Sequence, residues 1–270
     1  MDHREVGDRL NRLGRDTVPD IAADIIPTGM GLMAIATVTE RIKALRRTKL
    51  YDLLAAAPLI AWYAFNVAQM LQPLSQQIAL VKLMIQTDVS VLPATLVLKT
   101  VSQVATLAFL AVLVVLFAVR RVPQRTVPGL YPRFAAVAGT FLSVGIVQLP
   151  PQELSSWLYL IALVLIISGT GFALYAVLVL GRSISILPEA RRLVTRGPYA
   201  LVRHPLYLGE IVALAGVALQ YWSVWALLLW GLVCVFQLQR MTYEERVLSE
   251  VFPEYGDYVT RTARLLPGVY

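Results

Sequence analysis

Six apolar runs dominate the sequence and predict its architecture. They cover Leu53–Leu71, Val101–Val119, Phe134–Leu149, Trp157–Leu180, Leu206–Leu219 and Ser223–Leu238. A bilayer core about 30 Å thick takes roughly 20 apolar residues as a helix, so each run predicts a membrane-spanning helix, although the third and fifth are short. Only Gln220-Tyr221-Trp222 separates the last two runs, which predicts a helical hairpin with an aromatic tip at a membrane interface. The expected fold is all-α, a polytopic integral membrane protein with about six transmembrane helices.

The composition agrees with a membrane protein. Of the 270 residues, 57% are hydrophobic and 15% are charged, whereas soluble domains carry about 25% charged residues. A mean hydropathy of +0.65 likewise excludes a disordered, collagenous or ordinary soluble chain. Cys234 is the one cysteine, and His3 and His204 are the two histidines. The chain can therefore form no internal disulfide, and no metal site is expected.

The net charge of +7 is explained best by membrane topology. Bases gather before the first run and in the loops after the second and fourth, whereas residues 150–155, after the third, hold none. Because cytoplasmic loops of membrane proteins are rich in Lys and Arg, this alternation predicts that both termini face the cytoplasm, although Lys82 and Lys99 weaken it slightly. Such loops favour anionic lipid over nucleic acid as a partner. The expected location is the bacterial inner membrane, and the first residues lack the apolar segment of a secretory signal peptide.

The chain divides into three expected parts. Residues 1–50 mix aliphatic side chains with Arg and Asp, which predicts an amphipathic segment at the membrane surface. Residues 51–180 hold transmembrane helices 1–4, and residues 181–270 hold the polar motifs of a catalytic, cofactor-binding core. Gly29-Met30-Gly31 matches a dinucleotide fingerprint in outline, but no strand is predicted before it. Close helix packing or a local bend is the favoured use of these glycines.

The last third of the chain carries the residues expected to bind a ligand. Pro205 suits the first position of a helix, where its missing N–H costs little. The free N–H groups of that helix, beside Arg203 and His204, would attract a carboxylate or phosphate. Tyr199 and Tyr207 offer flat faces for a heterocycle or a cation. Glu244 and Glu245 offer acids that could hold ribose hydroxyls or an ammonium group. Together they predict a ligand with an anionic end, a cationic end and an aromatic ring, as S-adenosylmethionine has.

Each of these features also has a purely structural explanation. Arg196 and Arg203 would serve as positive-inside anchors, and His204 would cap an interfacial helix. The tyrosines would form an aromatic belt, and the paired glutamates would form a solvated helix face. Glu210, about one turn into the fifth run, is a functional candidate because an acid at membrane depth is costly. The functional interpretation depends on the ordered combination.

That combination consists of four motifs in the order Leu193-Val194-Thr195-x-Gly-x-Tyr199, Arg203-His204-Pro205-x-Tyr207-x-Gly209, Arg240-x-x-x-Glu244-Glu245 and Phe252-x-x-Tyr255-x-x-Tyr258-x-x-Arg261. It resembles the isoprenylcysteine carboxyl methyltransferase family, and the related membrane phospholipid methyltransferases share much of it. The resemblance covers roughly residues 180–267. Residues 1–50 have no counterpart in it.

The resemblance implies that S-adenosylmethionine is the cofactor, held without a Rossmann sheet in a cytosol-facing pocket. Carried over position by position, the cofactor-binding residues are Arg191, Leu193, Val194, Tyr199, His204, Pro205, Leu206, Tyr207 and Glu244. The resemblance also implies catalytic roles for two arginines, Arg240 in substrate handling and Arg261 as the tail arginine. Arg191 stands where the family often has a histidine.

The predicted function is methyl transfer to a lipophilic acceptor at the membrane, such as an isoprenylcysteine-like carboxylate, a lipid or a thiol. The expected partners are membrane lipid and that acceptor. Two alternatives stay open: an NADPH-dependent sterol-type reductase, because such enzymes also carry an Arg-His-Pro-x-Tyr-x-Gly segment, and a non-catalytic lipid-binding protein. The Thr195-x-Gly-Pro-Tyr199 lead-in and the spacing from Arg240 to Glu244 favour the methyltransferase.

Overall fold

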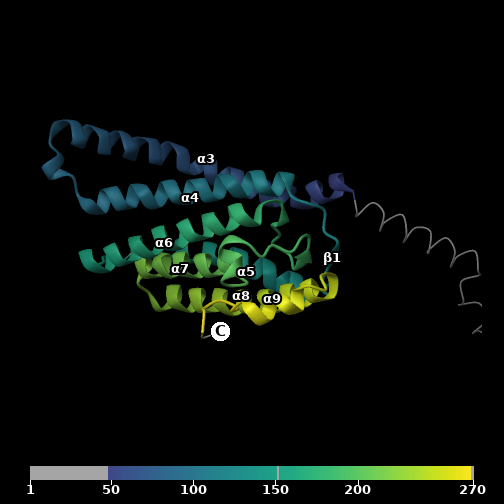
Figure 1. Cartoon of the computed structure of the whole chain (residues 1–270). Helices are drawn as coiled ribbons and strands as arrows, with labels where there is room; N and C mark the ends of the chain where they lie inside the picture. The colour runs from purple at the N-terminus through teal and green to yellow at the C-terminus, as the bar shows by residue number, and fades with distance from the viewer. Residues whose placement is uncertain (1–47, 151, 269–270) are drawn as a thin grey trace, which may run out of the picture. The chain divides into compact units, whose positions relative to one another are not determined.

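The structure, a computed structural model, describes residues 48–150 and 152–268, and it is almost entirely helical (Figure 1). Its α-helices are α3 (Lys49–Thr87), α4 (Ala94–Val119), α5 (Tyr131–Val147), α6 (Ser156–Leu180), α7 (Pro205–Tyr221), α8 (Val224–Val251) and α9 (Tyr255–Arg261). Short 3-10 turns occupy Val89–Val91, Gly181–Ser183 and Gly197–Ala200. Within the described residues, α3, α4, α6 and α8 are long and apolar enough to cross a membrane, and α5 and α7 are shorter apolar helices. The predicted all-α polytopic membrane fold is confirmed.

Each predicted span overlaps one of these helices, but two helices extend far beyond their apolar runs. Helix α3 continues past Leu71 to Thr87, and in this extension Gln77 Nε2 donates to Thr100 Oγ1 of α4 at 2.8 Å. Helix α8 continues past Leu238 to Val251. The sixth apolar run ends at Leu238, but the same helix carries Arg240, Glu244 and Glu245. Polar side chains do not interrupt the backbone hydrogen bonds of a helix, so hydropathy alone misplaces both ends.

The surface segment predicted for residues 1–50 falls almost wholly outside the described residues, as does the glycine motif at residues 29–31. Lys49 and Leu50, at the end of that segment, begin α3.

The ends of α7 and α8 follow their sequence signals. Pro205 occupies the first turn of α7, as predicted. Trp222 ends this helix in the left-handed conformation, with φ of 33°. Ser223 then caps α8, because its hydroxyl oxygen accepts a hydrogen bond from Ala226 N at 3.1 Å. This two-residue connection confirms the predicted helical hairpin.

Glycines allow α6 and α7 to pack with their backbones in direct contact. A Cβ at Gly169 of α6 would lie 2.3 Å from Ala213 N, and one at Gly209 of α7 would lie 2.6 Å from Ala173 N. No L side chain fits at these distances, and small residues serve membrane helices in the same way elsewhere. The contact fixes the end of α6 against the start of α7. The loop between them, residues 181–204, carries the first motif and the first two residues of the second, which continues into α7.

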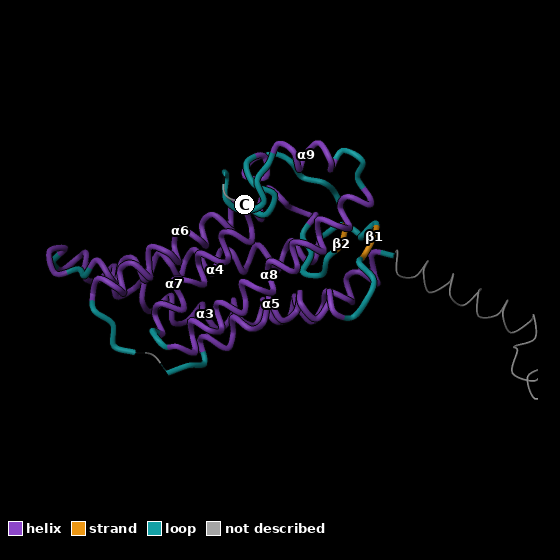
Figure 2. The backbone as a smooth tube through the Cα atoms, turned by 90° about the horizontal axis from the view of Figure 1, so that it is seen from below, coloured by secondary structure: helices purple, strands orange, loops and turns teal. Residues whose placement is uncertain are grey.

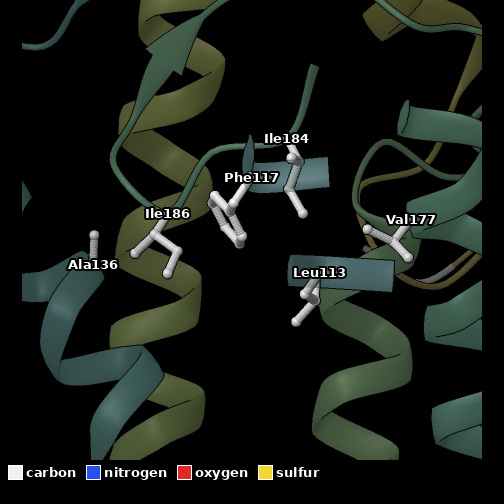
Figure 3. Packing of buried hydrophobic residues seen from close by; sticks show 6 residues of the cluster. All are labelled: Leu113, Phe117, Ala136, Val177, Ile184 and Ile186. Atoms are coloured by element: carbon white, nitrogen blue, oxygen red, sulfur yellow. The ribbon is translucent and has the colours of Figure 1, made fainter. Parts of the chain in front are cut away.

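An apolar cluster holds that loop against the helices (Figure 3). Ile184 and Ile186 of the loop are 3% and 6% exposed. They share the cluster with α4, α5 and α6 side chains, namely Leu113, Phe117, Ala136 and Val177. Burial of these side chains gives the loop a fixed base on which its polar residues are displayed.

Two short strands that the sequence did not predict tie the loops together. Strand β1 (Arg125–Thr126) pairs antiparallel with β2 (Glu189–Ala190). Both lie at one end of the bundle (Figure 2), where they contact α8. Val202 and Ala263 form a separate parallel bridge between the loop before α7 and the C-terminal tail. Strands of two residues have no periodicity that a sequence pattern could show.

Replacing Gly169 with alanine should damage the α6–α7 contact. The added Cβ would lie 2.3 Å from Ala213 N, so the helices must separate, and we expect a loss of about 1–3 kcal/mol in the free energy of unfolding, the usual cost of overpacking. Gly171→Ala is the matched control on α6, because a Cβ there meets nothing within 4 Å. Thermal unfolding in detergent compares the two variants. Equal midpoints would show that this contact does not limit stability.

Candidate active site

A pocket with about 740 Å³ of space, partly open to the outside, lies where the loop after α6 and the start of α7 meet the polar end of α8 and helix α9. The lining residues are Leu180, Ser183, Ser185, Glu189, Arg191, Arg192, Leu193, Val194, Tyr199, Arg203, His204, Leu206, Tyr207, Glu244, Leu248, Tyr255 and Tyr258.

The structure brings together most of the residues that the resemblance implies for the cofactor. Those that line the pocket are Arg191, Leu193, Val194, Tyr199, His204, Leu206, Tyr207 and Glu244. Pro205 is the exception, because it is fully buried in the first turn of α7. It terminates the loop and forms no part of the pocket wall. The placement agrees with the expected pocket, and the cofactor-binding role of each residue stays a prediction.

Glu244 is one of two acids, with Glu189, among the residues that line the pocket. Its Oε1 accepts hydrogen bonds from Tyr207 Oη and from Arg240 Nε, the second at 3.3 Å. The Arg240 guanidinium also lies over the Tyr207 ring, with Cζ 4.8 Å from the ring centroid. Among the described residues, no donor contacts Glu244 Oε2. This oxygen can accept a hydrogen bond from a hydroxyl or ammonium group of a ligand.

Glu245, the adjacent acid, joins α8 to the loop before α7 and to the C-terminal tail. Its Oε1 accepts a hydrogen bond from Arg203 Nε at 2.9 Å, and it lies 3.1 Å from His204 Nε2 and 3.3 Å from Arg264 Nε. These three bases belong to the loop before α7 and to the C-terminal tail. We call the group of four the Glu245 clamp. Consecutive side chains on a helix point about 100° apart, so Glu244 can face the pocket while Glu245 binds the clamp.

Three tyrosines supply aromatic faces and hydroxyl groups. Tyr258 Oη donates to the carbonyl oxygen of Tyr199 at 2.6 Å. The hydroxyls of Tyr199 and Tyr255 are buried and have no hydrogen-bond partner among the described residues. Burial raises the pKa of Tyr199 well above its usual value and the pKa of Tyr258 to about 12, so both stay protonated at neutral pH. Because an unpartnered buried hydroxyl is costly, a ligand that bonds to Tyr199 or Tyr255 would be stabilised.

Arg191 follows β2 and is held by two acids. Its Nη2 lies 2.6 Å from Glu189 Oε2 and 2.9 Å from Asp52 Oδ1 of α3. Its Nε and Nη1 are buried and have no partner among the described residues. An anionic group bound beside Arg191 would supply the missing acceptor.

Known proteins share the part of the chain that builds this pocket. The sequence pattern of the phospholipid methyltransferase family matches residues 157–255, which include nearly all of α6 and the whole of α7 and α8. Protein-S-isoprenylcysteine O-methyltransferase B of Arabidopsis thaliana is 30% identical over 135 residues, which make up 46% of this chain and 66% of that protein. The chain belongs to the isoprenylcysteine and phospholipid methyltransferase family.

Two bacterial relatives of this methyltransferase-family chain are metal-resistance proteins. The nickel-cobalt-cadmium resistance protein NccN of Alcaligenes xylosoxydans xylosoxydans is 32% identical over 80 residues, 29% of this chain and 38% of that protein. The cobalt-zinc-cadmium resistance protein CzcN of Cupriavidus metallidurans is 36% identical over 77 residues, 28% of this chain and 35% of that protein. The chain thus matches little more than a third of the length of these two proteins. From residue 48 to 268, leaving out 151, no three His, Cys, Asp or Glu side chains are grouped so that they could hold a metal ion.

The two arginines expected to be catalytic in this methyltransferase-family chain have different surroundings. Arg240 is 4% exposed, and its Nη2 donates to the carbonyl oxygen of Ser185 at 2.8 Å. It lies outside the set of lining residues and contacts three of them, Ser185, Glu244 and Tyr207. An arginine that only snorkelled to the membrane interface would keep its guanidinium exposed, so this burial does not fit such a role. Arg261 has an exposed side chain that donates to its own helix, so it does not line the pocket, and its catalytic role stays a prediction.

Several residues that line the pocket were given no role in the site from the sequence. Tyr255 and Tyr258 belong to the tail motif, and their spacing of three residues on one helix was the available signal that they share a face. Ser185 and Glu189 gave no such signal, because they lie in an irregular loop whose path depends on β1 and the apolar cluster.

Glu245→Gln should loosen the clamp. The substitution leaves Arg203 and Arg264 without their shared carboxylate, and we expect a loss of about 1.5–3 kcal/mol in the free energy of unfolding. Glu250→Gln is the control on the same helix. Its pair with Arg125 is solvent-exposed, at 57% for the arginine and 42% for the glutamate, and such pairs contribute about 0–1 kcal/mol. Thermal unfolding measures both variants, and equal losses would contradict the assignment of Glu245 as the clamp residue.

Proposed function

We propose that this protein is an S-adenosylmethionine-dependent methyltransferase that acts on a lipophilic acceptor at the membrane. One observation carries the proposal. The part of the chain that matches the methyltransferases also forms a pocket whose unpartnered polar atoms can bind the polar groups of S-adenosylmethionine. Because the match falls on methyltransferases, it favours methyl transfer over the hydride transfer that the sequence alone left open.

The pocket residues fit the chemical groups of S-adenosylmethionine. Arg191 offers unpartnered cationic donors for a carboxylate, and Glu244 Oε2 offers an acceptor for an ammonium group or a ribose hydroxyl. Tyr199 and Tyr255 offer flat faces for a heterocycle and hydroxyl donors for its ring nitrogens. When bound, S-adenosylmethionine would supply an electrophilic methyl group for transfer to the acceptor.

The chain contributes alignment and exclusion of water. Transfer to a carboxylate or thiolate is a single displacement that needs no general base, so the main demands are orientation and desolvation. Arg240 is a positioning residue in this proposal, because it holds Glu244 by an ion pair and Tyr207 by its ring face. The Glu245 clamp keeps the tail in place over the loop and so limits the access of water.

The acceptor approaches from the bilayer in this proposal. The pocket lies at one end of apolar helices, and α8 exposes large apolar side chains along its membrane half at Val224, Trp225, Leu228, Leu232 and Val235. An apolar acceptor can lie against these helices while its polar end reaches the pocket, whose mouth faces the cytoplasm of a bacterial cell.

Methyl transfer and its dependence on Glu244 can be tested together. Purified wild-type protein should transfer labelled methyl from S-adenosylmethionine to a component of a lipid, thiol and prenylcysteine panel. Glu244→Gln should weaken S-adenosylmethionine binding about 10- to 150-fold, the effect of losing one charged hydrogen-bond partner, and Glu250→Gln should not. Calorimetry measures the affinities. Unchanged affinity in Glu244→Gln would exclude this pocket, and binding of NADPH in place of S-adenosylmethionine would support a reductase.

The proposed orientation gives a separate prediction. Single cysteines at Thr195 and Ser249, both exposed near the pocket, should react with an impermeant thiol reagent only from the cytoplasmic face. A cysteine at Gln152, exposed in the connection before α6, should react only from the opposite face. Each is placed in a Cys234→Ala background and labelled in intact cells and in inverted vesicles. The reverse labelling pattern would place the pocket outside the cytoplasm.

A further inference from the structure

A buried ion network joins α3 to the pocket wall. Asp52 of α3 is 4% exposed and receives two arginines. Arg120 Nε donates to Oδ2 at 3.1 Å, and Arg191 Nη2 donates to Oδ1 at 2.9 Å. Arg191 Nη2 also reaches Glu189 Oε2 at 2.6 Å. These two acids and two arginines form one buried group, and the half-exposed Lys49 lies at its edge.

The position of Asp52 between two cations matters for both of them. Burial and the neighbouring charge of Arg191 lower the pKa of Arg120, and Asp52 opposes this shift. Without the carboxylate, two like charges would face each other in a site with little water, and such an arrangement is strongly unfavourable. Asp52 therefore decides whether Arg191 keeps its present place.

Only one half of the network touches the pocket. Arg191 and Glu189 line it, whereas Asp52 and Arg120 do not. Both acids bind the same nitrogen of Arg191, Nη2, and Nε and Nη1 have no partner among the described residues. Glu189 is itself shared, because Ser185 Oγ donates to its Oε2 at 2.7 Å. The remaining hold on the guanidinium comes from Asp52, which is 139 residues away in the sequence.

We propose that Asp52 is a positioning residue for ligand binding: it orients Arg191 toward the carboxylate of the bound cofactor, so that α3 belongs to the functional unit. The inference rests on the proposed function and goes beyond it, because α3 lies outside the part of the chain that matches the methyltransferase family. The competing explanation is that Asp52 only joins α3 to α4.

Two ligands separate these explanations. S-adenosylhomocysteine carries the amino-acid carboxylate and amino group, and 5′-methylthioadenosine has the same nucleoside with neither of them. Asp52→Asn in the full chain should weaken S-adenosylhomocysteine binding by about tenfold or more and leave methylthioadenosine binding within about twofold. Lys49→Gln is the control. Its ammonium lies 3.5 Å from Asp52 Oδ2, but its side chain is 46% exposed, so binding of both ligands should be unchanged.

Calorimetry and thermal unfolding on each variant give distinct outcomes. Equal losses for both ligands, or no loss for either, would overturn the positioning role. Failure of the wild type to bind either ligand would instead overturn the proposed function. If Asp52→Asn does not extract as a folded protein, Asp52→Glu keeps the charge balance and displaces the carboxylate. The same selective loss of S-adenosylhomocysteine affinity is then expected, and a non-selective result would count against the proposal.

Discussion

The pairing of buried charges is the constraint on which the polar end of this membrane protein depends. An apolar bundle offers little water to solvate an ion, so a charge that is buried there needs a partner of opposite sign. Each acid in or next to the pocket has one: Asp52 pairs with Arg120 and Arg191, Glu189 with Arg191, Glu244 with Arg240, and Glu245 with Arg203 and Arg264. Glu189 and Arg191 lie two residues apart and Glu244 and Arg240 lie one turn apart on α8, whereas the other partners come from segments far apart in the sequence. The pairs therefore also decide which loops meet and where the pocket forms.

The apolar part of the fold makes these pairs possible. Direct backbone contact at Gly169 and Gly209 fixes α6 against α7, and Ile184 and Ile186 anchor the loop between them. Charged side chains of this loop then need only small adjustments to reach α8. Ordering a long side chain costs rotamer entropy. Because the backbone of the loop is already fixed, each ion pair has to offset only this side-chain entropy. The helices and the ion pairs thus depend on each other.

Signals that are local in sequence were predictable, and long-range ones were not. The spans followed from apolar runs, and most lining residues followed from short motifs within residues 191–209 and 240–245. Asp52 gave no signal, because it is a single acid whose partners lie 68 and 139 residues away. The full length of α8 was not predicted, because the hydropathy of the sequence falls from Arg240 onward although the backbone continues as a helix. Tertiary pairing, which hydropathy does not describe, compensates the polar residues there.

The continuity of α8 explains how two neighbouring acids can serve different purposes. Because successive side chains diverge by about 100°, Glu244 faces the pocket while Glu245 holds the loop and the tail. Both are fixed to one helix. The distance between Glu244 and the loop and tail that Glu245 binds therefore cannot change much. A single-displacement reaction gains most from such fixed geometry, since misplacement by about 1 Å can cost about a hundredfold in rate. Elsewhere in the pocket wall, the ion pair with Asp52 fixes Arg191 to a second helix, α3. The pocket is thus held between two rigid elements, although much of its wall is irregular loop.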